Sequence, residues 1–439
     1  MTKIALMLLA GATVSTAALA DNTAMTRDEV RGMVSEMLAD AQTRSSLLQG
    51  GGMVGYDKGF MVGSADGNWK LVFNGLIQFR YMVNMRDDDE LAAGTVDDDL
   101  VNGFQMRKSR VVLSGNAVNP NLTYKIAFET NGLNAADEDQ NWFTNDLMFA
   151  YNLQNGWKIR AGQYKVGFLR EELNSEMYTM AAERSIMNNF FNQGRSDAVG
   201  FTYERDNWRW SFDFSDGFNT AGTDFNNPAE SEYAFTGRGE WKWAGSWEQL
   251  MDYTSKPGDA NAGSLGFAAH WQSDTQPNTA AGNSDAADLW AVTVDAQWEG
   301  NGWGLFGAFV YTDIETAADD FNHMGGVLQA SYRWNETSEI FVRWDGIILD
   351  DEDGGVDPAI DEDVHFVTAG YNHYFAGHNA KFTLDVIYSL TETANLLTAT
   401  TSANTNAGLN GSSLATSNGL LGSTDSGEFA VRAQFQLAF

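Results

Sequence analysis

The last stretch of the chain, Glu428–Phe439 with the sequence EFAVRAQFQLAF, decides between fold classes. Its large apolar residues, from Phe429 to Phe439, share one parity, and Arg432 shares the other parity with two glutamines. A period of two predicts a β-strand with one apolar and one polar face. In a soluble sandwich the polar face would meet water. In an outer-membrane barrel the apolar face would meet lipid, and the polar face would line a lumen.

The composition of the 439 residues limits the possible classes of protein. A formal charge of −32 argues against nucleic acid as a partner. The absence of cysteine excludes disulfides and thiolate metal sites. A disordered acidic chain would lack the 13% of aromatic residues found here. Many glycines and few prolines, 44 and 5, suit a long continuous sheet.

The amino-terminal residues precede the sheet. Met1–Ala20 reads as a secretory signal peptide, with a lysine, a short apolar run and an Ala-Leu-Ala end. Thr26–Gln49 predicts an amphipathic helix that begins with a capping box. A helix this short needs a partner, which is either other copies of the chain in a coiled coil or its own barrel. We therefore expect a signal peptide over 1–20, a helix and glycine linker over 21–55, and a barrel over 56–439.

From Trp69 onward, alternating segments recur, and short and long connections follow one another in turn. This is the topology of an outer-membrane barrel with tight periplasmic turns and long outside loops. Ala244–Ala262 reads as a longer inner turn with a short helix around Trp247–Tyr253, which gives about sixteen strands. Outside the amino-terminus there is no run of about 18 apolar residues, which excludes helical membrane spans. The predicted long loops are Met85–Asn102, Asn131–Asn145, Lys165–Arg195, Ser215–Ser231, Ser273–Asp288, Asp313–His323, Leu349–Asp363 and Thr391–Gly427.

Several motifs resemble the phosphate-selective porin O and P family. They are YDKGF at Tyr56–Phe60, FQMRKSRVVLSG at Phe104–Gly115, AGQYKVGF at Ala161–Phe168, ERS at Glu183–Ser185 and AGYNHY at Ala369–Tyr374. In the third motif, Val-Gly stands where the family more usually has an acidic residue and proline. The resemblance implies an all-β, trimeric, sixteen-stranded outer-membrane barrel whose third loop folds inward, with the terminal phenylalanine as its assembly signal.

About half of the basic residues share the polar, inward parity, whereas acidic residues gather in the long loops. This segregation predicts a lumen that favours anions. The alternative is that the cations pair with inward carboxylates on neighbouring strands. The predicted pore-lining residues are Lys70, Arg80, Lys108, Arg110, Lys125, Lys158, Arg160, Arg209, Arg238, Lys242, Arg333, Arg343, Lys381 and Arg432.

Loop Lys165–Arg195 is the predicted constriction. Its opposed charges would either orient polar solutes in a transverse field or pair and hold the loop down. The candidate residues are Lys165, Arg170, Glu176, Glu183 and Arg184.

No motif supports catalysis, because the five histidines show no metal or triad spacing. We predict no enzyme, cofactor or metal. The expected function is an outer-membrane porin for passive diffusion of small hydrophilic solutes, with anions such as phosphate favoured. A general or cation-tolerant porin is the alternative, and a structural protein that ties the membrane to the cell wall is the alternative from another class. The expected partners are outer-membrane lipid, two further copies in a homotrimer and small anionic or polar solutes, but no nucleic acid.

Overall fold

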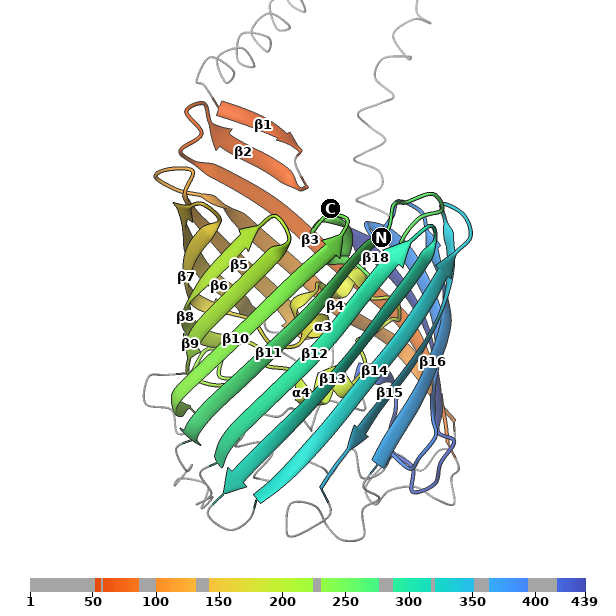
Figure 1. Cartoon of the computed structure of the whole chain (residues 1–439). Coiled ribbons are helices and arrows are strands. Elements are labelled where there is room, and N and C mark those ends of the chain that lie inside the picture. The colour runs from red at the N-terminus through yellow and green to blue at the C-terminus, as the bar shows by residue number, and fades with distance from the viewer. Residues whose placement is uncertain are drawn as a thin grey trace, which may run out of the picture. The chain divides into compact units, whose positions relative to one another are not determined.

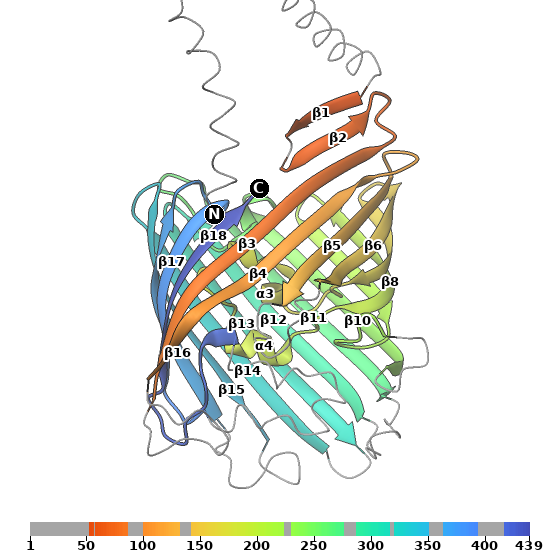
Figure 2. The same ribbon diagram turned by 180° about the vertical axis from the view of Figure 1, so that it is seen from behind.

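The computed structural model describes residues 52–56, 58–86, 100–131, 142–223, 230–275, 287–316, 320–350, 363–393 and 417–439. Its sixteen long strands, β3 to β18, form one closed antiparallel barrel (Figures 1 and 2). Two shorter strands come first, β1 (Gly52–Tyr56) and β2 (Phe60–Ser64), and β2 pairs with β3. The predicted signal peptide and the predicted helix Thr26–Gln49 lie outside the described residues.

Each barrel strand pairs with its neighbours in sequence. None of the helices described is long and apolar enough to cross a membrane. The barrel strands are β3 (Lys70–Met85), β4 (Leu100–Asn116), β5 (Leu122–Asn131), β6 (Trp142–Gln154), β7 (Trp157–Tyr164), β8 (Ser196–Arg205), β9 (Trp208–Ser215), β10 (Ser231–Ala244), β11 (Ala262–Thr275), β12 (Ala287–Gly300), β13 (Trp303–Thr316), β14 (Asp320–Arg333), β15 (Ser338–Ile348), β16 (Asp363–Tyr374), β17 (Ala380–Ser389) and β18 (Phe429–Ala438). The short helices are α3 (Arg170–Leu173), η3 (Glu176–Tyr178), α4 (Ile186–Phe191) and η4 (Gln249–Met251).

The stretch that ends the chain closes the barrel. Strand β18 pairs with β3, with Phe435 opposite Phe79. The amide of Phe439 donates to the carbonyl of Gly75 at 3.0 Å, and the Gly75 amide donates back at 2.9 Å. A β-carbon on Gly75 would lie 2.3 Å from the Phe439 ring. Only glycine therefore leaves room for the terminal ring at this seam.

Tight turns join the strands at one end of the barrel, which we call the short-turn end. Between β12 and β13, Asn301 and Gly302 have φ of +48° and +87°. Both values are left-handed, as a two-residue type I′ turn requires, and Asn-Gly is its preferred pair. The predicted inner turn is also present, because β10 ends at Ala244, β11 begins at Ala262, and η4 lies between them.

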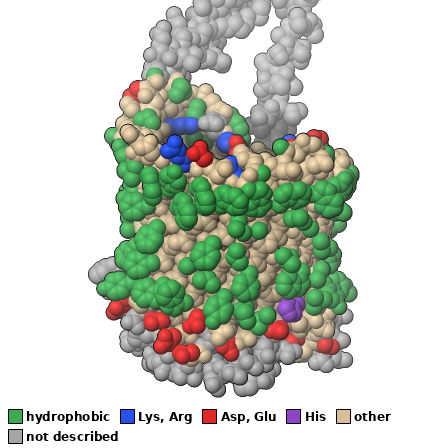
Figure 3. Space-filling model, viewed as in Figure 1, with side chains coloured by type: hydrophobic (Ala, Val, Ile, Leu, Met, Phe, Trp, Pro, Cys, Tyr) green, Lys and Arg blue, Asp and Glu red, His purple; other side chains and the backbone are tan. Residues whose placement is uncertain are grey.

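The outer face of the barrel is apolar. Trp210, Leu305 and Val342 expose between 44% and 50% of their surface, as expected of side chains that meet lipid. Figure 3 shows hydrophobic side chains over the visible wall and acidic ones gathered at its lower edge, where the long loops begin. We call that edge the long-loop end.

One predicted loop is wrong. Asp313–His323 is mostly strand, because β13 runs to Thr316 and β14 begins at Asp320. The charges misled the prediction, since Asp313 and Glu315 are exposed at the long-loop end. Carboxylates in that position stay solvated and do not interrupt the ladder of backbone hydrogen bonds.

The core of the protein lies inside the barrel, where the sequence predicted a wholly polar face. Near the long-loop end, Val310, Ile347, Phe366 and Ile387 of β13, β15, β16 and β17 are fully buried. They pack around α4 and the segment Val166–Leu169 in a single apolar cluster. The inner wall of these strands therefore serves as a packing surface, and the largest described open space is lined by other strands, β3–β7.

Candidate functional site

The loop between β7 and β8, Lys165–Arg195, folds into the barrel, and we call it the inward loop (Figures 1 and 2). Strands β15 and β17 hold it in place. Arg343 of β15 donates to the carbonyl of Glu183 at 2.9 Å, and Lys381 of β17 donates to the carbonyl of Thr179 at 2.7 Å. The apolar cluster adds burial to these hydrogen bonds. The inward loop is therefore a fixed part of the lumen.

Helix α4 of the inward loop begins with a full set of capping contacts. The Ser185 hydroxyl accepts from the amide of Asn188 at 2.9 Å, as an N-cap does. The Asp345 carboxylate of β15 accepts from the amide of Ile186 at 2.7 Å. The positive end of the helix dipole, at the N-terminus, also stabilises this carboxylate. Glu171 in turn accepts from the Ser185 amide at 2.8 Å, which ties α3 to the start of α4.

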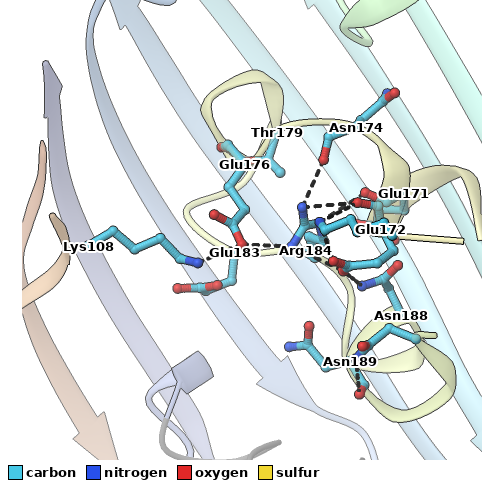
Figure 4. A network of polar contacts seen from close by, with 12 residues as sticks. Lys108, Glu171, Glu172, Asn174, Glu176, Thr179, Glu183, Arg184, Asn188 and Asn189 are labelled. Atoms are coloured by element: carbon cyan, nitrogen blue, oxygen red, sulfur yellow. Dashed lines mark hydrogen bonds and ion pairs between the residues drawn. The ribbon is translucent and has the colours of Figure 1, made fainter. Parts of the chain in front are cut away.

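Glu176 is the centre of an ion network between the inward loop and β4 (Figure 4). Its carboxylate pairs with Lys108 at 2.6 Å, with Arg110 at 2.8 Å and with Arg184 at 2.8 Å. Glu129 of β5 pairs with both β4 cations, at 2.7 Å and 2.5 Å. Three cations thus share two carboxylates, before the loop's other charges are counted.

Lys165 and Glu172 extend this network along the loop. Glu172 pairs with Lys165 and, at 3.1 Å, with Arg184. Burial and the nearby Arg184 guanidinium lower the pKa of Lys165 to about 7. Burial alone would raise the pKa of Glu172, but the two cations outweigh it and lower that pKa to about 2. Lys165 is therefore a side chain of the inward loop whose charge changes near neutral pH.

A second cluster joins the loop to β3 and β4. Glu183 pairs with Arg80 at 2.7 Å and also with Arg107. The pairing of β3 with β4 shifts between Gln78 and Phe79, so that Arg107 is an extra residue in β4. A bulge of this kind re-aims a side chain, which places Arg107 inside although its parity predicts otherwise. Burial would raise the pKa of Glu183, but Arg107 and Arg80 lower it to about 2.

A third cluster lies on the wall at the carboxyl end of the inward loop. Asp146 of β6 pairs with Lys125 of β5 and with Arg195, each at 2.7 Å. A second register shift makes Asn145 an extra residue of β6, and its amide donates to Glu129 at 2.8 Å. Parity alone could not have placed Asn145 in the lumen.

The three clusters together carry an excess of positive charge. Eight cations share five carboxylates, which leaves a net charge of +3 when Lys165 is protonated. The cations are Arg80, Arg107, Lys108, Arg110, Lys125, Lys165, Arg184 and Arg195, and the carboxylates are Glu129, Asp146, Glu172, Glu176 and Glu183.

The open space lies beside this network. A cavity of about 790 Å³ runs between the inward loop and β3–β7, and we call it the passage. Arg110, Lys125 and Arg160 line it from the strands, and Lys165 and Arg184 line it from the loop. A further cavity of about 520 Å³ lies next to it, and Arg195 lines both. This shared residue marks the junction of the two spaces.

Several other arginines inside the barrel pair with carboxylates of their own. Arg160 pairs with Asp213 at 2.8 Å and Arg432 with Asp385 at 2.7 Å. Arg343 pairs with Asp345 at 3.2 Å and with Glu171 at 4.0 Å. Arg238 and Arg170 share Glu240 and Asp295. Five of the eight cations in the three clusters line the passage: Arg110, Lys125, Lys165, Arg184 and Arg195.

The predicted pore-lining residues take different places around the inward loop. Lys242 and Arg333 donate to carbonyls of the short turns, Gly245 and Glu336. Lys158 and Arg209 line a cavity of about 450 Å³ near the short-turn end. Lys70 lies at the start of β3. Arg80, Lys108, Arg238, Arg343, Lys381 and Arg432 are buried.

The predicted constriction residues also divide. Only Lys165 and Arg184 line the passage. Glu176 and Glu183 lie behind them as counter-ions, and Arg170 pairs with Glu240 of β10 on the far side of the loop. The sequence did not single out Arg107, Arg195 or Asp146. For Arg195 a signal existed, because it is the last residue of the predicted loop.

A second segment, Ser417–Gly422, fills the lumen beside the seam. Arg80 donates to the carbonyl of Ser417 at 2.8 Å, and Arg432 donates to the Asn418 side chain at 3.1 Å. Leu420 is fully buried in the apolar cluster. Arg80 therefore links this segment to Glu183 of the inward loop. Because its side chain is buried, it holds the two segments together and does not face the solute.

At the short-turn end, Tyr56 and Lys58 lie over the passage and line it together with Glu248. Lys58 pairs with Glu248 at 2.9 Å, although both side chains are more than three-quarters exposed. On the other side, Asn74 donates to the carbonyl of Lys58. In the described part of the chain, no group of three or more His, Cys, Asp or Glu side chains could hold a metal ion.

Comparison with known families gives one match. Residues 79–409, most of the chain, match the model of the family described as phosphate-selective porin O and P. No curated protein sequence matches the chain significantly.

Solved structures share the barrel at low sequence identity. The outer membrane channel DcaP of Acinetobacter baumannii is 12% identical, with a TM-score of 0.53, over 88% of this chain and 100% of that one. OmpF of Salmonella typhi, in a complex with daunomycin, is 13% identical, with a TM-score of 0.53 over the same shares. OmpT of Vibrio cholerae is 9% identical, with a TM-score of 0.51, over 84% of this chain and 98% of that one. At these identities the likeness shows the fold alone.

Proposed function

The chain belongs to the phosphate-selective porin O and P family and is a channel protein of the outer membrane, and on this premise we propose that its passage conducts small hydrophilic solutes by passive diffusion and favours anions such as phosphate. The single observation that carries the anion preference is the net charge of +3 on the three ion clusters beside the passage. No turnover chemistry and no cofactor belong to this proposal.

The physical basis is the position of the excess charge. Cations that line a narrow channel with low-dielectric walls raise the local concentration of anions, because field lines are focused along the water. Charges that are paired one to one cancel at the distance of a solute. The pairs around Asp213, Asp295 and Asp385 therefore contribute little to selectivity.

The proposal extends to assembly and processing. A homotrimer embedded in outer-membrane lipid is the expected assembly, and the exposed apolar wall supplies surface for both neighbours and lipid. Residues 1–20 are proposed as the signal peptide, and the residues from 21 up to the start of β1 at Gly52 as a periplasmic helix with a glycine linker. The last strand, with Phe439 held at the seam, fits an assembly signal at the carboxyl end.

The acidic long-loop end favours a second candidate, a cation-tolerant porin. Asp288, Glu315 and Asp320 lie directly opposite one another on β12, β13 and β14. Carboxylates at the mouth raise the local concentration of cations and oppose the field of the passage.

Recordings of the purified protein in planar bilayers test both candidates. Discrete conductance steps are expected, with a zero-current potential of anion-selective sign across a tenfold KCl gradient. Replacing chloride with phosphate should preserve the current at pH 7. If no conductance steps appear, the proposed channel activity is refuted. A zero-current potential of cation-selective sign would reject the anion-favouring channel and support the cation-tolerant porin.

A further inference from the structure

The lining of the passage is of two chemical kinds, and only one of them suits an inorganic ion. Besides the cations, apolar side chains line it from both sides: Val112 and Met148 from the wall, and Leu173 and Met177 from the inward loop. All four are half-buried, so part of each side chain faces the open space. The passage is thus amphipathic along its whole width.

On the wall, apolar and cationic groups alternate at close range. Met148 of β6 lies directly opposite Lys125 of β5 in the sheet register. Val112 follows Arg110 by two residues on β4, so both point into the lumen. The cross-strand spacing of about 5 Å puts Met148 beside Lys125, whereas Val112 lies two residues, about 7 Å, along the strand from Arg110.

The inward loop repeats this pairing on the opposite side. Leu173 ends α3 and Met177 lies in η3, between the cations Lys165 and Arg184. A thioether side chain is flexible and adapts to irregular shapes, so methionines on both sides suit ligands of varied outline. All four apolar groups line the cavity, and Met148 also packs against the apolar cluster of the lumen.

An inorganic phosphate gains nothing from such groups. It is hydrated on every side, and contact with an apolar surface removes water without supplying a hydrogen bond. An organic anion with an apolar body gains from both kinds of lining: its carboxylate meets the cations, and its hydrocarbon skeleton covers the methionine, leucine and valine side chains. About 790 Å³ is enough room for a small ring compound.

We infer that the passage is a binding site for organic anions with an apolar body, such as carboxylates on an aromatic or branched aliphatic skeleton. This inference rests on the proposed anion-favouring channel and specifies its class of solute. Binding is weak and reversible, as conduction requires, and slows the solute while it crosses the passage.

Sodium benzoate and sodium acetate make a matched pair of probes, because both are monocarboxylates and only benzoate has an apolar body. Each is added to both sides of a planar bilayer that holds the full-length protein in KCl, and the concentration that halves the chloride current is measured. Benzoate is expected to act at a concentration about tenfold lower than acetate, from the apolar area that it buries. The zero-current potential is recorded in the same membranes.

Variants locate the site. Met148→Ser combined with Met177→Ser should bring the two half-inhibiting concentrations together without changing the sign of the zero-current potential. Met85→Ser, on the outer face of β3, is the matched control and should keep the tenfold ratio. If the double variant does not fold, Val112→Thr keeps the side-chain volume and should lower the ratio by about twofold to threefold.

The outcomes separate the two claims. Equal half-inhibiting concentrations in the unaltered protein, with an anion-selective potential, would overturn the inference and leave the proposed function standing. A cation-selective potential would overturn the proposed function itself. A tenfold ratio that survives in the Met148 and Met177 variants would show that benzoate is held elsewhere, which also overturns the inference.

Discussion

Neutralising Lys125 is the sharpest test of the charge at the junction of the two cavities. Lys125 pairs with Asp146, but 46% of its side chain is exposed, so Lys125→Gln should fold normally. Arg195 still pairs with Asp146 at 2.7 Å in that variant, and the carboxylate is not left alone. The net charge of the three ion clusters falls from +3 to +2.

The expected magnitude follows from Coulomb's law. A unit charge about 6 Å from a permeating ion in water-like surroundings stabilises an anion by about 0.7 kcal/mol and destabilises a cation by as much. Salt at about 0.1 M removes nearly half of this, because the Debye length is about 10 Å. One charge should therefore change the anion-to-cation permeability ratio by about threefold.

The assay is the zero-current potential across a KCl gradient. Lys125→Gln should lower the permeability ratio by about threefold, and Lys125→Gln with Arg195→Gln by about tenfold. Asp146→Asn should raise the ratio by about threefold, because it removes the carboxylate that the two cations share. Lys256→Gln is the control, since Lys256 is exposed in the inner turn Ala244–Ala262. A ratio for Lys125→Gln equal to that of the control would refute the reasoning.

Three further predictions concern the inward loop, the seam and pH. Glu183→Gln leaves the buried Arg80 and the partly buried Arg107 without their carboxylate, so the free energy of unfolding should fall by about 3–5 kcal/mol. Glu204→Gln, whose pair is half exposed, should cost less than about 1 kcal/mol in the same thermal unfolding series. Gly75→Ala should slow refolding into the heat-modifiable form on gels and lower its melting temperature, because the β-carbon would meet the terminal ring at 2.3 Å; Gly237→Ala, with open space at the β-carbon, should behave as the unaltered protein, and equal behaviour of the two would contradict the steric argument. The pKa of Lys165 is lowered to about 7, so its positive charge is lost as the pH rises through 7. The anion-to-cation permeability ratio should therefore be higher at pH 6 than at pH 8. If Lys165→Gln shows the same change in the ratio between pH 6 and pH 8, another group causes it.

The fold was predictable from sequence because a membrane strand has a simple rule. Lipid on one side and a lumen on the other impose a period of two, and closure without edges imposes alternating turns and loops. Glu428–Phe439 obeys this rule throughout, and it is the strand that closes the barrel against β3. The inner turn of Ala244–Ala262 was also predictable, since an odd number of strands would have reversed every later turn.

The interior was less predictable, because parity gives the face of a residue but not its neighbours. Two register shifts place Arg107 and Asn145 inside against their parity. The apolar inner wall of β13–β17 depends on a loop distant in sequence that packs against it. No local pattern in those strands contains that information.

The sequence by itself determined the barrel, its closing strand, the inward loop as a segment and the segregation of cations to the inner face. Only the tertiary structure decided which of those cations are neutralised and which leave an excess. The reason is that pairing depends on distances across the barrel: Arg80 meets Glu183, and Arg432 meets Asp385, whereas Lys125 and Arg195 must share Asp146. The charge of the passage is therefore a property of the folded lumen and not of the composition.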